Sequence, residues 1–385
     1  MKRHLMTTSH DQFRSMVRSF IDREVLPNRE QWDALGHPPR EFFHKLGELG
    51  VLGMCIPEEY GGGGESSFAY NAIVFEEVAR AGVSFGSFTV HSCVALPYVL
   101  EYATNEQKRQ WLPGMSDGTL MTAIAMTEPG TGSDLAGIST RARITGDGTS
   151  YVVNGAKTFI TGGAVADLIF VVCRTSTPVD GDRRQGLTML GVPTDSDGFS
   201  VTRTLRKLGL HQQDTTELTF DDVVVPAENV LGTVGEAFSY LGHNLPQERL
   251  SIALNQVGFA EAAIEQARVY AQAREVFGKP VSTFQNTRFV LAECSTETQA
   301  ARVYADHCLQ LLDRKELSAA DAARAKLFCS EVAGRVVDKC LQLHGGYGYI
   351  DDFPISRLYA DTRVSRIYGG TSEIMKSIIA KDMEV

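Results

Sequence analysis

The sequence lacks the features that define several large classes of protein. Its longest strongly apolar run, Leu168 to Cys173, is the length of a strand and too short to cross a membrane. It has no low-complexity tract. It has no excess of positive charge either, because the formal net charge is −10, and this argues against nucleic acid as the main partner. The sequence therefore predicts a globular protein that neither spans a membrane nor binds nucleic acid.

The chain also lacks signs of an oxidising compartment. Polar residues follow Met1 to Leu5, so there is no apolar signal core. The seven cysteines are dispersed and contain no Cys-x-x-Cys pair, and most, such as Cys173 and Cys340, have apolar neighbours. Buried free thiols in a reducing compartment are the simplest interpretation, and we expect a cytoplasmic protein. His91 and Cys93 have no further ligand nearby, so core packing is favoured and no metal site is predicted.

What the sequence does contain is a periodicity that changes twice. A chain of 385 residues is too long for one simple core. Apolar residues recur at helical spacing in residues 1–121 and again in residues 234–385, where long helices with short connections favour a bundle. Residues 122–233 instead show short runs of period two, punctuated by Gly, Asp and Pro, which favours a small barrel or sandwich. The fold class predicted is α+β.

Two turns are predicted inside the middle unit. The runs 141–145 and 151–153 flank Gly146-Asp147-Gly148, which indicates a hairpin. Asn154-Gly155 directly follows and predicts a further tight turn.

The most distinctive segment is residues 125–134, Ala-Met-Thr-Glu-Pro-Gly-Thr-Gly-Ser-Asp. Its glycines let the backbone approach a flat ligand, and its hydroxyls supply short donors and acceptors. Composition alone favours this interpretation no more than an ordinary Pro-Gly turn with an Asp or Ser cap.

This segment resembles the Thr-Glu-Pro-x-x-Gly-Ser-Asp signature of the acyl-CoA dehydrogenase family, and similar motifs follow in order along the whole chain. The resemblance implies an N-terminal α-helical domain (1–121), a middle β-barrel (122–233) and a C-terminal four-helix bundle (234–385). It also implies an FAD cofactor. The strip that it places against the flavin runs from Ile124, just before this segment, to Ser133. Its contact residues are Ile124, Ala125, Met126, Thr127 and Ser133, with Ser133 also near the pantetheine arm of the substrate.

A second segment, residues 157–163, resembles the family's Trp-Ile-Thr/Ser-Asn-Gly element. Phe159 stands where many members have Trp, and Gly162 stands where they have Asn. The resemblance implies that Phe159, Ile160 and Thr161 contact the flavin. Taken alone, a Phe in a strand is more typical of an ordinary core.

Further cofactor contacts implied by the resemblance lie in the last domain. They are Arg274, Phe277, Gln285, Gln342, Leu343, Gly345, Gly346, Thr371 and Glu373. Arg274 suits a phosphate contact, although an Arg at a helix C-terminus also interacts well with the helix dipole. In the family, the Arg274 turn and the Gly345-Gly346 turn serve a neighbouring subunit, which implies at least a dimer and usually a tetramer. No Gly-x-Gly-x-x-Gly follows a predicted strand, so a nicotinamide-binding unit is not indicated.

The family's reaction needs a base for the α-proton of the thioester and hydrogen bonds to its carbonyl. Many members place the base in a Tyr-Glu-Gly-Thr motif, where this chain has Gly369. Long-chain and isovaleryl-type members use a segment ending Glu-Arg-Leu, which matches Glu248 here. The resemblance implies Glu248 as the base, Gly369 as a backbone donor, and a substrate site that includes Ser133, Pro246, Gln247, Arg249, Gly369 and Gly370. Without the resemblance, Glu248 would more often be an ion-paired helix residue beside Arg249.

The function predicted is FAD-dependent dehydrogenation of an acyl-CoA to the trans-2-enoyl-CoA, with the β-hydride passing to flavin N5. The partner predicted for the electrons is an electron-transferring flavoprotein. Alternatives are a dehydrogenase acting on acyl groups bound to a carrier protein, an acyl-CoA oxidase, and a flavin-bearing binding protein without activity.

Overall fold

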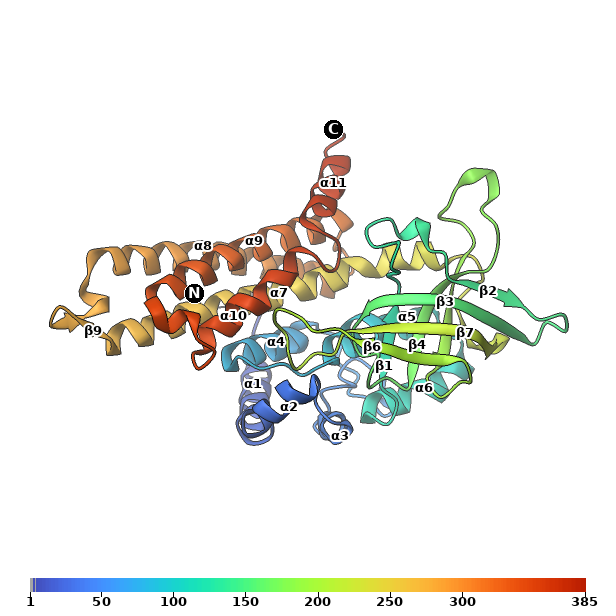
Figure 1. Ribbon diagram of the computed structural model, residues 1–385, viewed down its shortest axis with the longest axis horizontal. Helices are drawn as coiled ribbons and strands as arrows, with labels where there is room; N and C mark the ends of the chain where they lie inside the picture. Colours follow the sequence, from blue (N-terminus) through green and yellow to red (C-terminus); the bar gives the residue numbers. More distant parts are fainter. Residues whose placement is uncertain (1–2, 4) are drawn as a thin grey trace.

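Helices from both ends of the chain flank a sheet formed by its middle part (Figure 1). A computed structural model describes residue 3 and residues 5–385. The N-terminal helices are α1 (Thr8–Phe20), α2 (Arg29–Leu35), α3 (Arg40–Glu48), α4 (Ala69–Ala81), α5 (Leu96–Tyr102) and α6 (Asn105–Asp117). A π-helical segment, Val90–Ala95, leads directly into α5.

Cap residues set the ends of several helices. Thr104 precedes α6, and its hydroxyl accepts a hydrogen bond from the Gln107 N–H while the Gln107 side chain accepts one from the Thr104 N–H. Gly82 and Gly118, both with positive φ, end α4 and α6. These boundaries follow from local sequence.

The C-terminal domain is built from three long helices and two shorter ones. They are α7 (Ala237–Ala273), α8 (Gln285–Asp313), α9 (Ala319–Leu343), α10 (Pro354–Thr362) and α11 (Ser372–Asp382). A two-stranded hairpin, β9 (Glu275–Val276) and β10 (Lys279–Pro280), connects α7 to α8 at the end of the domain far from the sheet (Figure 1). The predicted order of helices, strands and helices is confirmed.

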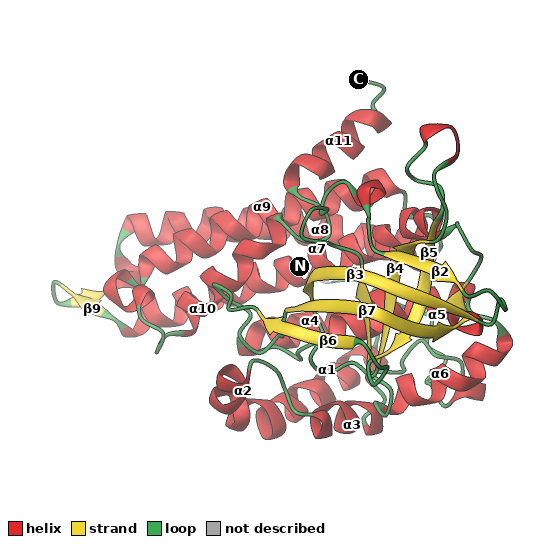
Figure 2. Ribbon diagram, turned by 45° about the vertical axis from the view of Figure 1, so that its right-hand side comes forward, coloured by secondary structure: helices red, strands yellow, loops and turns green. Residues whose placement is uncertain are grey.

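The middle domain is an open sheet, so the predicted β-barrel is wrong. Its strands are β1 (Thr122–Ala125), β2 (Arg141–Ile144), β3 (Ser150–Ile160), β4 (Leu168–Arg174), β5 (Leu187–Pro193), β6 (Phe199–Thr204), β7 (Thr216–Pro226) and β8 (Val230–Leu231). The order is β6-β7-β3-β2-β4-β5-β8, and β1 pairs with β4 in parallel. The sheet stays open because β6 is a largely exposed, polar edge strand and β8 has only two residues to offer. Figure 2 shows the strands gathered at one end of the molecule, with α7 to α9 extending away.

The hairpin predicted in this domain is confirmed, but the second turn is not. Strands β2 and β3 pair from Arg141↔Asn154 to Ile144↔Tyr151. The chain does not turn at Asn154-Gly155, because β3 continues through it with an irregular register against β7. A Cβ added to Gly155 would lie 2.6 Å from Thr140 Oγ1, so glycine is needed here for close approach of another segment.

The domains share apolar cores. One cluster joins Leu96 of α5, Leu112 of α6, Phe170 of β4 and Leu241 of α7. A second cluster joins the N-terminal helices to α7, α8 and α9. The start of α7 is therefore fixed against both the sheet and the N-terminal domain.

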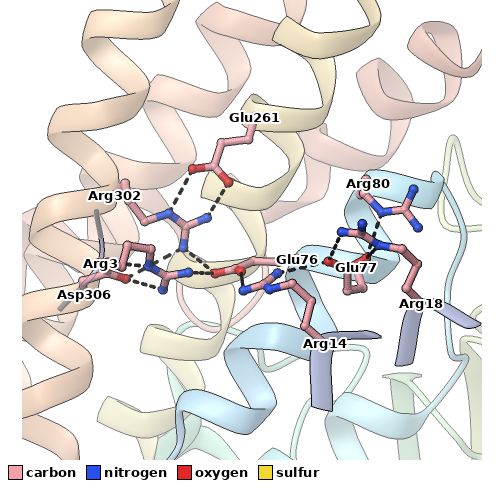
Figure 3. Close-up of polar contacts among 9 residues, drawn as sticks. All are labelled: Arg3, Arg14, Arg18, Glu76, Glu77, Arg80, Glu261, Arg302 and Asp306. Carbon is pink, nitrogen blue, oxygen red and sulfur yellow. Dashed lines mark hydrogen bonds and ion pairs between the residues drawn. The ribbon is translucent and has the colours of Figure 1, made fainter. Parts of the chain in front are cut away.

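Ion pairs also join the N-terminal helices to α7 and α8 (Figure 3). Arg302 of α8 is buried, and its guanidinium lies 2.8 Å from Glu76 of α4 and 2.7 Å from Glu261 of α7. Burial alone would raise the pKa of the neighbouring Glu77, but its hydrogen bonds from Arg18, Arg80 and Arg14 lower that pKa to about 2. A carboxyl whose pKa is lowered on folding stabilises the fold at any pH above its ordinary pKa. That stabilisation is lost only as the pH falls toward 2. The remaining members of the network are Arg3 and Asp306.

Candidate active site

The two predicted flavin segments lie side by side in the sheet domain. The Thr158 N–H donates to the Thr127 carbonyl at 3.0 Å, which joins the end of β3 to the loop after β1. Ile124 and Ala125 belong to β1 and have buried side chains, so they offer a ligand their backbone only. Met126 and Thr127 are half-buried and Ser133 is exposed.

A buried ion pair between Lys157 and Glu128 fixes these two segments to each other. Lys157 Nζ donates to the Met126 carbonyl and to Glu128 Oε1, each at 2.9 Å. Glu128 also accepts hydrogen bonds from Ser139 and Thr140. Burial raises the pKa of Glu128, but Lys157 and these donors outweigh it and bring the pKa to about 2. Glu128 therefore serves to shape the loop, and the loop is held as a rigid structure.

Phe159 is not a core residue. Its φ of 58° turns the backbone into the left-handed region, and its side chain is 67% exposed. The following loop is fixed by Asp214, whose carboxylate accepts from the Gly162 N–H at 3.0 Å and the Ala164 N–H at 2.8 Å. Ile160 is buried, whereas the Thr161 hydroxyl is half-buried and accepts from Gln213. An exposed phenyl ring is a suitable stacking surface for a flat polar ligand.

Glu248 lies in the first half of α7, and its Oε2 is shielded from solvent without a hydrogen-bond partner. Burial raises the pKa of Glu248, while Arg249 and Lys326 act in the opposite direction. The Tyr98 hydroxyl of α5 is also buried without a partner, and burial together with the charge of Glu248 raises the pKa of Tyr98. A carboxylate with a raised pKa and an unused oxygen has the properties of a general base.

Gly369 faces Glu248 from the turn before α11. A Cβ added to Gly369 would lie 3.5 Å from Glu248 Oε1 and 2.4 Å from Ile252 Cδ1. Gly369 has a φ of 63°, and its carbonyl accepts from Arg249 Nε at 3.3 Å. Residues 248 and 369 are far apart in the sequence, yet side chains at both positions would reach the same space.

The neighbouring substrate and cofactor candidates surround this turn. Gly370 has a φ of 96° and follows Gly369 directly. Thr371 caps α11, its hydroxyl accepting from the Ile374 N–H at 3.3 Å, and Glu373 lies in the first turn of that helix. Pro246 is buried within α7.

The π-helical segment Val90–Ala95 connects the two halves of the site. Gln247 Nε2 of α7 donates to the Cys93 carbonyl at 3.1 Å. His91 Nδ1 accepts from the Thr122 N–H of β1 at 3.0 Å, and Nε2 lies 2.9 Å from the Met115 carbonyl. Burial lowers the pKa of His91 to about 4, so the ring is neutral near pH 7 and donates from Nε2. The Glu248 region and the first flavin segment are therefore held to one short element.

The remaining cofactor candidates lie elsewhere. Arg274 ends α7, and the helical rise places it roughly 39 Å along the axis from Glu248. It lies over the ring of Tyr347, 5.6 Å from its centroid, in the turn that follows α9. The Phe277 side chain is 95% exposed at the tip of the β9–β10 hairpin. The other candidates at this end of the domain are Gln285, Gln342, Leu343, Gly345 and Gly346. They do not meet the Glu248 site within one chain.

Sequence reasoning missed two groups that the structure places at this site. Lys326 lies in α9, in a stretch of small residues where a lysine resembles an ordinary solvent-facing residue, yet it is fully buried. Tyr98 resembles a core aromatic in an apolar run. The only signal in the sequence was helical register, since Lys326 falls on the apolar face that includes Cys329 and Ala333.

Comparison with known proteins assigns this architecture. Models of the acyl-CoA dehydrogenase N-terminal, middle and C-terminal domains match residues 7–119, 123–223 and 235–384. The long-chain specific acyl-CoA dehydrogenase of Sus scrofa mitochondria is 42% identical over 99% of this chain and 88% of its own length. The chain belongs to the acyl-CoA dehydrogenase family.

Solved structures agree. An acyl-CoA dehydrogenase from Geobacillus kaustophilus has a TM-score of 0.96 at 42% identity, with both chains covered completely. A glutaryl-CoA dehydrogenase from Mycobacterium smegmatis in complex with FADH2 has a TM-score of 0.88 at 30% identity, covering 98% of this chain and 95% of that one. The prediction of a flavin-dependent oxidoreductase with FAD as its cofactor is thus confirmed.

None of the helices in residues 5–385 is both long and apolar enough to span a bilayer. Within the same part of the chain, no three His, Cys, Asp or Glu side chains are grouped to hold a metal ion.

Proposed function

We propose that this protein dehydrogenates a saturated acyl-CoA thioester to the trans-2-enoyl-CoA, with Glu248 removing the α-proton. The proposal depends on one observation, the 3.5 Å between Glu248 Oε1 and the position of a Cβ on Gly369. If many family members place their base at position 369, then Glu248 reaches the same α-carbon from α7. A glycine at position 369 then means that the base has moved to position 248, and not that the base is missing.

The surroundings of Glu248 suit this role. Burial already raises the pKa of Glu248, and acyl-CoA that displaces water from the site would raise that pKa further, toward that of the α-carbon. Within the described residues, no hydrogen bond uses the Gly369 N–H, which leaves it available for the thioester carbonyl. A donor placed there strengthens its bond as enolate charge develops.

The sheet domain supplies groups that fit a flavin. The Thr127 and Thr161 side chains offer hydroxyls, and the exposed Phe159 ring offers a stacking surface. A Cβ added to Gly130 or Gly132 would meet nothing within 4 Å, so this loop leaves open space beside its backbone. When bound, the flavin supplies the acceptor, N5, for the hydride that leaves the β-carbon. Exposed Ser133 remains our candidate for the pantetheine arm, and Arg249 and Gln247 for contacts near the thioester.

The test is anaerobic titration of the purified FAD-bound protein with saturated acyl-CoAs of graded length. We expect the oxidised flavin spectrum to bleach with a preferred chain length, since α-proton removal and hydride loss together reduce the flavin. Bleaching only by acyl groups on a carrier protein would change the substrate class. Flavin that stays oxidised with every thioester would support a binding protein instead.

The electron acceptor is a separate part of the proposal. We propose an electron-transferring flavoprotein, and expect it to be reduced when acyl-CoA is added. Steady hydrogen peroxide production without an added acceptor would instead identify an oxidase.

We also propose that a second copy of the chain completes each FAD site. The 39 Å estimated along α7 between Glu248 and Arg274 supports this, because the phosphate candidates then lie far from the flavin segments of their own chain. Arg274→Met removes the guanidinium and keeps much of the stem. Loss of a charge-assisted hydrogen bond predicts FAD binding weaker by about 10- to 100-fold, measured by FAD released on dilution.

Arg268→Met is the matched control, since Arg268 is exposed on the last turns of α7 and pairs with Glu265. It should retain FAD as the unaltered protein does. Sedimentation should give at least a dimer, and a stable, active, FAD-saturated monomer would contradict the shared site.

A further inference from the structure

A fully buried lysine holds the turn that faces Glu248. Lys326 Nζ donates to the Gly370 carbonyl at 2.5 Å. Arg249 Nε donates to the preceding carbonyl, that of Gly369, at 3.3 Å. Two cations from different helices, α9 and α7, therefore bind successive carbonyls of one glycine turn.

We propose that Lys326 is a positioning residue that fixes the Gly369-Gly370 turn opposite Glu248 and holds the Glu248 carboxylate ionised when water has left the site. This rests on the proposed function, because it assigns Lys326 a role in the reaction of that same site. The role has two parts, a hydrogen bond and a charge, and each can be removed separately.

The energetic argument begins with burial. Removing an ammonium group from water is costly unless it is paired, and one carbonyl satisfies only one of its three donors. An apolar side chain of similar length would fill the same volume more cheaply. A lysine at this position is thus better explained by its donor and its charge than by packing.

The charges around Glu248 show what Lys326 contributes. The titratable and charged groups that act on Glu248 are Tyr98 from α5, Arg249 from α7, Lys326 from α9 and Tyr368 from the turn before α11. Of these, only Arg249 and Lys326 are cationic, and both lower the pKa of Glu248 against the effect of burial. The two phenols have no positive charge to offer.

The pKa of Lys326 is itself lowered by its surroundings. Burial and the charge of Arg249 lower the pKa of Lys326 to about 8, while Glu248, Glu331 and Glu373 act to raise it. The Lys326 ammonium group is therefore largely protonated at pH 7 and carries a positive charge beside Glu248.

The experiment measures removal of the α-proton separately from hydride transfer. The probe is an acyl-CoA with oxygen in place of the β-carbon, so that no β-hydrogen can leave and the flavin stays oxidised. In deuterated buffer, Glu248 removes the α-proton and solvent returns deuterium, with no net oxidation. The exchange rate is measured against pH by mass spectrometry of the thioester.

Lys326→Met removes both donor and charge, and Lys326→Gln keeps an amide donor without the charge. We expect both to move the acid limb of the exchange profile to higher pH, because a cation that lowers the pKa of Glu248 is gone. Lys326→Met should also lower the exchange plateau by about 10- to 100-fold, since the turn is no longer held. Lys339→Met, a half-buried lysine later in α9 that pairs with Glu293 and Glu297, should behave as wild type.

The outcomes separate the two proposals. If Glu248→Gln exchanges as fast as wild type, the proposed base is wrong. If exchange depends on Glu248 but neither Lys326 variant moves the acid limb, the role of Lys326 is wrong. A loss that is equal at every pH in both variants means that Lys326 only stabilises the fold. The Gln variant keeps the test available if the Met variant does not fold.

Discussion

Glu248→Gln is expected to slow flavin reduction by saturated acyl-CoA by on the order of 10²–10⁴-fold while FAD remains bound. Gln keeps the shape of the side chain and removes the proton acceptor. FAD retention should not change, because none of the flavin candidates in the sheet domain bonds to Glu248 in the described structure. The measurement is single-turnover reduction of the flavin in a stopped-flow instrument.

The same variant predicts two further results. Because burial raises the pKa of Glu248, the unaltered protein should lose rate as the pH falls through that raised value, and the residual rate of the variant should not titrate there. A carboxyl with a raised folded pKa also costs stability as the pH rises above its unfolded value near 4.5. Removing it should leave the melting temperature at pH 8 unchanged or higher.

The matched control is Glu265→Gln, an exposed glutamate later in α7 that pairs with Arg268, and it should leave the rate unchanged. Near-normal reduction by Glu248→Gln would place the base elsewhere. Glu373, in the first turn of α11, would be tested next.

The sequence predicted the order of the domains correctly, but it did not predict that the sheet of the middle domain stays open. Helical and strand periods are local, so the change near residue 122 and the hairpin of β2 and β3 could be read directly. Sheet closure depends on which edges pair, and a period of two in the sequence does not show that β6 is an exposed edge strand or that β8 has only two residues. Gly155 shows the same limit: its sequence favours a turn, but close approach of Thr140 keeps it within a strand.

For the candidate site, motifs identified the residues that lie in continuous segments. They gave Phe159 and Glu248, but not what surrounds them. Lys326 was missed because its function depends on a contact 44 residues away with Gly370, and a lysine in a helix is usually solvated. The steric role of Ile252 was missed for a similar reason, since it is visible only once Gly369 is placed beside α7.

That steric role determines how the base can be moved back. A glutamate at position 369 meets two obstacles. Its Cβ would lie 2.4 Å from Ile252 Cδ1, and the φ of 63° costs a residue with a Cβ about 1–2 kcal/mol. Ile252→Val removes the Cδ1 methyl and relieves the first obstacle, since the next Ile252 atom is 3.9 Å away. The backbone strain remains, so only partial recovery is expected.

In a background of Glu248→Gln with Ile252→Val, adding Gly369→Glu should raise the rate of flavin reduction by at least about 10-fold, a small part of the range that a general base contributes. The new carboxylate starts from a Cβ that lies 3.5 Å from where Glu248 Oε1 was, so it approaches the same α-carbon. The control is Gly369→Gln in the same background, which introduces the same bulk and the same strain without a base. The recovered rate should rise with pH through a single carboxyl titration, measured by single-turnover reduction across the pH range. Equal rates in the Glu and Gln variants, with FAD bound in both, would show that positions 248 and 369 do not serve one α-carbon.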